Sequence, residues 1–241
     1  MTHVAHPFVQ RIGVNRDWKS RWFTTSPEQF REYLRIDAAL RKLLKKRLKG
    51  MSVDGVEIER SDKDIRIIIK SARPGLIIGR SGEGITQLKK EIDLFLRQQG
   101  AKSKPELKID IEEVRSPESS ARIVGQMIAE GLEKRMTFRR VMKQTAEKVM
   151  ANRDVEGVRI ILSGRLGGAD MARKEEIKKG RVPLQTLRAD IDFARVEANL
   201  PYGVIGIKTW IYRGDVFADR TANRDAQEEA RTARPARRPR N

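Results

Sequence analysis

Four residues, Gly79-Arg80-Ser81-Gly82, have the types and the spacing to hold a phosphate backbone. The glycines lack side chains, so a sugar-phosphate strand can approach the main chain closely, and the two central side chains can donate hydrogen bonds to phosphate. The apolar pattern predicts a helix on each side, so the first N–H groups of the second helix would lie unpaired beside the loop. The segment therefore predicts a turn that contacts nucleic acid. An ordinary interhelical turn with a glycine cap is the alternative.

A second group of cations lies on the helix predicted for residues 137–151. At 100° per residue, Arg139, Arg140 and Lys143 fall within slightly more than a quarter-turn, and Arg135 extends the stripe backwards. Glu147 lies on the same arc, so a simple solvated face is the alternative to a phosphate-binding surface. The apolar residues point the other way: Phe138, Val141, Met142, Thr145 and Val149.

The charge balance also indicates a polyanionic ligand. The chain of 241 residues has 51 Lys and Arg against 33 Asp and Glu, a formal net charge of +18. Such an excess favours RNA or DNA, because Lys and Arg displace counterions condensed on phosphates. An anionic membrane surface would call for aromatic anchors, and only 5% of residues are aromatic. No apolar run reaches the ~18 residues of a membrane span, and the N-terminus lacks the order of a signal peptide.

Metal and nucleophile chemistry has few candidate residues. The chain has no cysteine, which excludes disulfides and suits the cytosol, and its two histidines are His3 and His6. Asp190 and Asp192 would project from one face of a strand, where two carboxylates can bind Mg²⁺ in a nuclease. Pairing with Arg188 and Arg195 is the alternative, and no third acid supports the enzyme. We expect no catalytic residue, no metal and no cofactor.

The segment Ser163–Ala169 is rich in glycine and lies between strand-like segments. It lacks the Gly-Lys-Ser/Thr ending of a P-loop and the spacing of a dinucleotide-binding fingerprint. We interpret it as a tight turn in which Arg165 contacts RNA.

The first block of elements, predicted for residues 26–115, has the order helix, strand, strand, helix, helix, strand. Ser26-Pro27-Glu28-Gln29 predicts a helix start with a capping box, and the helix runs to Gly50, with a break near Ile36-Asp37 as one option. The strands alternate around Val56–Glu59, Ile65–Lys70 and Leu107–Glu112.

The second block, residues 116–218, predicts two helices on a mostly antiparallel sheet. The first helix would start at Ser116-Pro117, and strands are expected at Val158–Leu162 and near 170–178, 184–198 and 204–213. Both blocks are therefore α+β domains. The Arg-rich segment 219–241 lacks an apolar period and is predicted to be a disordered basic tail.

Residues 1–25 are predicted to form a basic N-terminal arm. Its aromatic residues Trp18, Trp22 and Phe23 alternate with cations. The aromatic rings can stack on bases, or they can anchor the arm on its own domain.

These motifs together resemble known families. The element order and the sequence Ile77–Ile85 are similar to a type II KH domain. The second block and the N-terminus resemble the bacterial form of the family of universal small-subunit ribosomal protein number three, over nearly all of residues 1–215. The motifs that carry this resemblance are His6-Pro7, Arg11-Ile12-Gly13, Trp18–Phe23, Val158–Leu162, Ser163–Ala169, Gly180–Leu184, Thr186–Asp192 and Tyr202–Lys208.

The resemblance implies a structural, non-catalytic RNA-binding component of the small ribosomal subunit, in the cytoplasm. It implies a place in the subunit head on ribosomal RNA beside proteins ten and fourteen, and a surface where messenger RNA enters, beside proteins four and five. It also implies a contribution to messenger unwinding from the positions of Arg139, Arg140 and Lys143. Ser81 stands where relatives often carry lysine. A free-standing KH regulator of single-stranded RNA is the alternative function. Further candidates for ribosomal RNA contacts are Arg73, Arg165, Arg173, Lys174 and Arg181.

Overall fold

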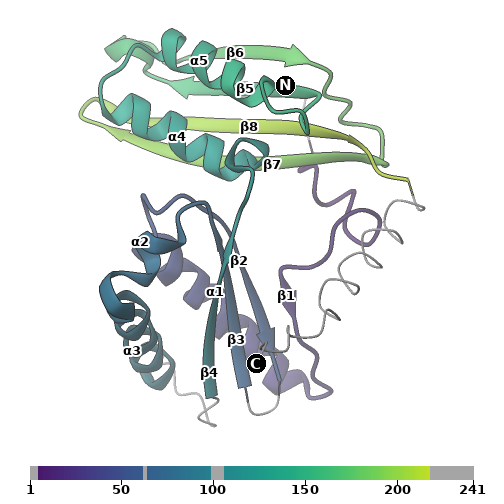
Figure 1. Cartoon of the computed structure of the whole chain (residues 1–241), viewed down its shortest axis with the longest axis vertical. Helices are drawn as coiled ribbons and strands as arrows, with labels where there is room; N and C mark the ends of the chain where they lie inside the picture. Colours follow the sequence, from purple (N-terminus) through teal and green to yellow (C-terminus); the bar gives the residue numbers. More distant parts are fainter. Residues whose placement is uncertain (1–4, 62–63, 99–105, 218–241) are drawn as a thin grey trace, which may run out of the picture.

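The computed structural model describes residues 5–61, 64–98 and 106–217. These residues form two α+β units, called the first and the second layer below, which follow one another along the long axis of the molecule (Figure 1). The elements of the first layer follow the predicted order helix, strand, strand, helix, helix, strand, preceded by one short strand. They are β1 (Ser20–Arg21), α1 (Pro27–Arg47), β2 (Val53–Arg60), β3 (Asp64–Ser71), α2 (Pro74–Ile78), α3 (Glu83–Gln98) and β4 (Glu106–Glu113).

The sheet of the first layer has the strand order β1-β2-β3-β4. Strands β2 and β3 are antiparallel, whereas β4 is parallel to β3 and β1 is parallel to β2. Alternate residues of the strands point towards the helices, as the sequence pattern predicts. The core that they form with α1, α2 and α3 contains Ile36, Leu40, Leu44, Ile58, Ile65, Ile67, Ile69, Ile77, Leu88, Ile92 and Leu96.

The other face of this sheet is covered with ion pairs. Arg21 of β1 bridges Glu57 and Glu59 of β2 at 3.2 and 2.8 Å, and Lys70 of β3 contacts Glu57 at 2.7 Å. Because β1 lies within residues 1–25, the predicted N-terminal arm supplies one strand to this sheet.

Helix α1 is continuous through Ile36-Asp37, so the option of a break there is wrong. Asp37 is buried but has two partners on other elements: Arg60 at 2.6 Å and the indole nitrogen of Trp22 at 2.8 Å. The predicted capping box is also wrong. The Ser26 side chain caps nothing, and the Gln29 side-chain oxygen accepts a hydrogen bond from Thr24 instead.

The second layer contains two helices and a four-stranded antiparallel sheet of order β6-β5-β8-β7. Its elements are α4 (Ala121–Glu133), α5 (Phe138–Met150), β5 (Gly157–Gly164), β6 (Arg173–Gly180), β7 (Ala189–Leu200) and β8 (Gly203–Asp215). The expected helix start at Ser116 is wrong: Pro117–Ser119 form a 3₁₀ turn, and α4 starts at Ala121 with Ser120 as its cap, accepting from the Ile123 N–H at 3.3 Å.

The two faces of the second sheet pack against different parts of the chain. Helices α4 and α5 cover one face with a core that includes Val124, Ile128, Met142, Val149, Ile160, Ile207 and Ile211. On the other face, Phe8 from the N-terminal segment packs on a cluster containing Phe193 and Trp210. The predicted tail at 219–241 and His3 lie outside the described residues. In the part of the chain that the structure describes, no helix is long and apolar enough to cross a membrane.

Candidate RNA-binding surfaces

The Gly79–Gly82 segment is a tight, exposed turn between α2 and α3, as predicted. Helix α2 ends at Ile78. The residue that follows as its C-cap, Gly79, has φ 71°, and both Ser81 and Gly82 also have positive φ, at 51° and 80°. The side chains of Arg80 and Ser81 are exposed, and the turn leads directly into the first turn of α3. Glycine adopts positive φ without steric cost, whereas Ser81 holds a conformation that L side chains seldom adopt. The loop can therefore present main-chain N–H groups and a guanidinium to one phosphate strand.

Gly84 fixes the distance between the two helices that carry this loop. A Cβ at this position would collide with the carbonyl oxygen of Ile77 and lie 2.9 Å from that of Ile78. The first turn of α3 can approach the end of α2 this closely only because residue 84 has no side chain.

We expect Gly84→Ala to lower the free energy of unfolding by about 2 kcal/mol, the typical cost of overpacking at a closed site. Gly75→Ala is the matched control, because its Cβ would meet nothing within 4 Å and its φ is not positive. Urea denaturation of both variants measures the difference. Equal midpoints for the two variants would contradict the steric role of Gly84.

Helix α5 presents the predicted stripe to solvent. Arg139, Arg140 and Lys143 are exposed, and Arg135 is exposed in the turn before the helix with φ 60°. Among the described residues, neither Arg140 nor Lys143 has a carboxylate within 4.0 Å. The buried side of the helix is formed by Val141, Met142, Thr145, Ala146 and Val149.

The one acid on the arc of the stripe is already paired. Glu147 contacts the ammonium group of Lys179 on β6 at 3.1 Å, so its negative charge is offset locally. This ion pair reduces the repulsion that Glu147 would exert on a phosphate strand along α5.

The stripe continues from α5 onto β6. Arg139 and Arg173 both contact Glu175, at 3.5 and 3.6 Å, and both guanidinium groups lie over the ring of Phe138. These contacts hold two cations side by side with one carboxylate between them. Arg173 was predicted separately from the stripe, and the structure brings it to the same surface.

In the described chain, none of the remaining predicted cations shares the contacts with Phe138 and Glu175. Arg73 is exposed at the start of α2, Lys174 is exposed on β6, and Arg181 is exposed just after β6. Arg165 is engaged within its own turn, where it donates to the carbonyl of Ala169 at 2.9 Å and pairs with Asp170 at 3.1 Å.

The glycine-rich segment 163–169 is a tight turn, as predicted. Gly164, Gly167 and Gly168 all have positive φ, and Leu166 is buried beneath them. The internal contacts of Arg165 close this turn, so its first role is structural.

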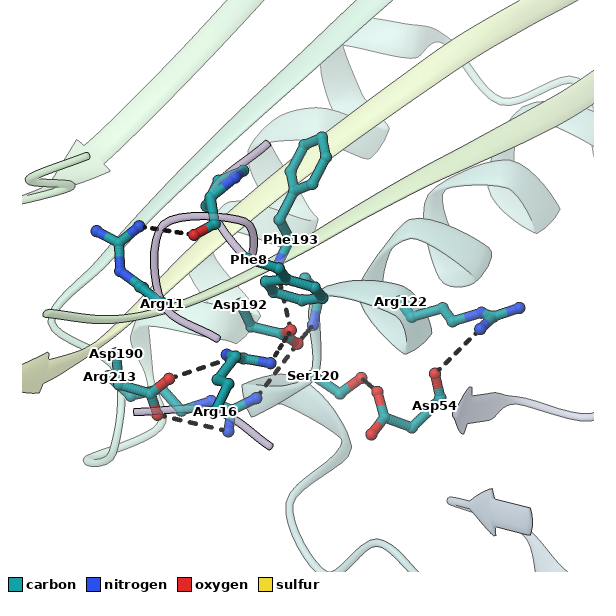
Figure 2. A network of polar contacts seen from close by, with 12 residues as sticks. Phe8, Arg11, Arg16, Asp54, Ser120, Arg122, Asp190, Asp192, Phe193 and Arg213 are labelled. Atoms are coloured by element: carbon teal, nitrogen blue, oxygen red, sulfur yellow. Dashed lines mark hydrogen bonds and ion pairs between the residues drawn. The ribbon is translucent and has the colours of Figure 1, made fainter. Parts of the chain in front are cut away.

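Asp190 and Asp192 have partners other than the predicted ones. Both carboxylates form ion pairs with Arg16 of the N-terminal segment and with Arg213 of β8, at 3.2–3.8 Å (Figure 2). The predicted pairing with Arg188 is wrong, because Arg188 contacts Asp215 at 2.8 Å. In the described part of the chain, no group of three or more His, Cys, Asp and Glu side chains could hold a metal ion.

The Asp192 side chain, which comes from β7, also caps the N-terminus of helix α4. Its carboxylate accepts a hydrogen bond of 2.7 Å from the N–H of Ala121, the first residue of α4. A negative charge at a helix N-terminus is stabilised by the helix dipole and by the unpaired N–H groups. The pair of aspartates therefore ties α4, β8 and the N-terminal segment together.

Sequence patterns do not predict the other contact between the N-terminal segment and the second layer. Arg11 is fully buried and donates to the carbonyl oxygens of Pro7, Leu184, Thr186 and Ala189 at 2.7–3.0 Å. Its partners on the second layer lie more than 170 residues away, so no local pattern marks it. The only signal was its place in the Arg11-Ile12-Gly13 motif.

The structure shows the anchoring role for one aromatic residue of the arm, and stacking of the others on bases stays a prediction. Trp22 is anchored on α1, where it packs against Phe30 and Tyr33. Trp18 and Phe23 are 63% and 87% exposed, so their rings remain accessible to a ligand.

Comparison with known proteins agrees with both layers. The family described as KH domain matches residues 39–119, and the family described as ribosomal protein S3, C-terminal domain, matches residues 128–211. The small ribosomal subunit protein uS3 of Chromobacterium violaceum is 45% identical over 237 residues, covering 98% of each chain. That of Caldicellulosiruptor saccharolyticus is 44% identical over 222 residues, covering 92% of this chain and 96% of the relative. With relatives this similar along almost the whole chain, the protein belongs to the ribosomal protein S3 family.

Proposed function

We propose that this chain is a structural, non-catalytic RNA-binding component of the small ribosomal subunit, working in the cytoplasm. The observation that carries the proposal is the similarity to proteins named small ribosomal subunit protein uS3, at 42–45% identity over at least 92% of this chain. The exposed turn at Gly79–Gly82 and the cationic surface of α5 suit such a role, because both offer donors to phosphate without a catalytic group beside them.

Within the subunit, we propose a place in the head on ribosomal RNA, with proteins ten and fourteen as neighbours. The surface formed by α5 and β6 would lie where messenger RNA enters, beside proteins four and five. Arg140 and Lys143 support this assignment, because both are exposed and neither is neutralised by a carboxylate of the described chain. Cations fixed on a helix can hold one strand of a messenger hairpin by its phosphates while the hairpin opens.

We expect Arg139→Ala, Arg140→Ala and Lys143→Ala together to slow translation through a stable messenger hairpin by about fivefold, because three phosphate contacts are lost. Translation of an unstructured messenger should change little. The measurement compares the two messengers in a reconstituted translation system.

The control removes the same charge away from α5 and β6: Arg31→Ala, Arg115→Ala and Arg153→Ala, three exposed cations with no carboxylate partner in the described chain. Both variants should sediment with the small subunit in a sucrose gradient at moderate salt. Normal translation through the hairpin by the stripe variant would refute the unwinding role alone. A wild-type chain that stayed at the top of the gradient would instead refute the ribosomal role and favour the free-standing KH regulator.

A further inference from the structure

A cleft of about 840 Å³ lies between the two layers. One wall is α1, and the opposite wall is formed by α4 and β7. The α1 wall carries a row of cations that includes Lys42, Lys45 and Lys46. The cleft lies away from the Gly79–Gly82 turn and from the α5 stripe, and none of its residues belongs to either.

Three further cations line the cleft from three different segments. Lys19 comes from the N-terminal segment, Arg122 from α4 and Arg195 from β7. Among the described residues, none of them has a carboxylate within 4.0 Å. Arg122 makes one long hydrogen bond of 3.5 Å to the carbonyl of Asp54, as Figure 2 shows.

The other contacts of these cations are weak. The ammonium group of Lys19 lies 5.4 Å from the centre of the Phe8 ring, and the guanidinium of Arg195 lies 5.5 Å from that of Phe193. Most of the hydrogen-bonding capacity of the three side chains is therefore free to bind a ligand.

The two carboxylates near these three cations, those of Asp54 and Asp192, bind other residues. The Asp54 carboxylate accepts a hydrogen bond from Ser120, and Asp192 is gripped by Arg16 and Arg213. They offset part of the positive charge but form no ion pair with the cleft cations.

The cations are close enough to repel one another. Burial and then the charge of Arg122 lower the pKa of Lys19, and burial lowers the pKa of Arg122 itself. The pKa of His6 is lowered by burial and then by Arg195 and Lys19, which places these two charges near one side chain. An anion bound among them would relieve this repulsion.

The charge of the cleft lining is mostly positive. Eight lysine and arginine side chains line the cleft, against three glutamates, Glu130, Glu133 and Glu197. Of these glutamates, Glu133 contacts Lys49 of α1 at 3.9 Å, so part of its charge is offset. An extended polyanion is therefore attracted by the cleft as a whole.

We propose that this cleft binds the phosphodiester backbone of an RNA strand, with Lys19, Arg122 and Arg195 as the phosphate ligands. The proposal rests on the proposed function, since it assumes that the partner is the RNA of the subunit. Cations from both layers and from the N-terminal segment would converge on one strand, so the strand would also hold the layers in a fixed orientation.

The first test measures binding of a fluorescein-labelled 12-nucleotide oligouridylate to the full chain by anisotropy, over a range of KCl concentrations. We expect Lys19→Gln, Arg122→Gln and Arg195→Gln together to weaken binding about tenfold at 0.1 M salt and to reduce the slope of log K against log salt by about two, because roughly 0.7 counterions are released per phosphate contact on a single strand. The control variant Arg31→Gln, Arg115→Gln and Arg153→Gln has the same charge, lies outside the cleft and outside α5 and β6, and should retain the slope. Equal slopes for the two variants would overturn the proposal.

The second test works in the assembled subunit and keeps the three cations intact. A photoreactive diazirine lysine replaces Lys42, which lines the α1 wall, and a second preparation carries it at Lys148 as a control. We expect irradiation to link position 42 to ribosomal RNA. A link to an acidic protein segment, or no link in a chain that sediments with the small subunit, would overturn the proposal and leave the ribosomal role intact.

Discussion

Replacing Arg11 with methionine is expected to lower the free energy of unfolding by about 3 kcal/mol or more. The guanidinium of Arg11 is fully buried and donates to four carbonyl oxygens, three of them on the segment between β6 and β7 and at the start of β7. Methionine fills similar volume but donates nothing, so these acceptors would stay buried without partners. Each such group costs about 1–3 kcal/mol.

The control for this variant is Asn15→Ala. Asn15 also bonds the second layer, through a hydrogen bond of 3.0 Å to the carbonyl of Leu187, but this bond is exposed to water. Its loss should cost less than about 0.5 kcal/mol. Urea denaturation followed by tryptophan fluorescence measures both variants, and an Arg11→Met midpoint equal to that of Asn15→Ala would contradict the role assigned to the buried guanidinium.

Asp192→Ala is expected to destabilise the protein by about 2–3 kcal/mol, because the buried N–H of Ala121 loses its acceptor and the arginines Arg16 and Arg213 keep only Asp190 as a partner. The carboxylate contacts Arg16 at 3.3 Å and Arg213 at 3.2 Å, and it accepts the hydrogen bond from Ala121 at the start of α4. Its side chain is only 9% exposed, so solvent replaces little of this. The measurement is the unfolding midpoint in urea.

Asp190→Ala is the matched control, because Asp190 contacts the same two arginines but is 19% exposed and caps no helix. It should cost about 1 kcal/mol. The same pair of variants tests the nuclease alternative. The nuclease alternative would be restored if the wild-type protein cleaved RNA with Mg²⁺ and the variants lost this cleavage while keeping their stability. From the contacts of Asp192 we expect the opposite: the wild-type protein does not cleave RNA, and the Asp192 variant is less stable.

The sequence predicted well the features that depend on neighbours in the chain. The turn at Gly79–Gly82 and the helix that follows it are set by glycine conformations and by a local apolar period, both visible in the sequence. The order of elements in both layers follows from the same periods. The helix start at Ser116 was placed too early because Ser-Pro also begins a 3₁₀ turn, and Ser120 caps the real helix.

Predictions of features that depend on residues distant in the sequence were absent or wrong. The break considered near Ile36-Asp37 does not occur, and Arg60 and Trp22 satisfy the buried Asp37 carboxylate from other elements. The cationic stripe was identified, whereas the neutralisation of Glu147 by Lys179 depends on the packing of α5 against β6. Domain boundaries at 26–115 and 116–218 and the contacts of individual cations with RNA stay predictions.

The position of Arg11 has a consequence for the protein as it leaves the ribosome that makes it. Its partner at Ala189 is synthesised 178 residues later, so the earliest segment of the nascent chain has to wait for almost the latest strand. Until β7 emerges, Phe8 and Arg11 lack the residues that they pack against, whereas Ser20-Arg21 and Trp22 can already pack on β2 and α1. A chain that stalls before residue 189 therefore lacks the Ala189 carbonyl to which the Arg11 side chain donates.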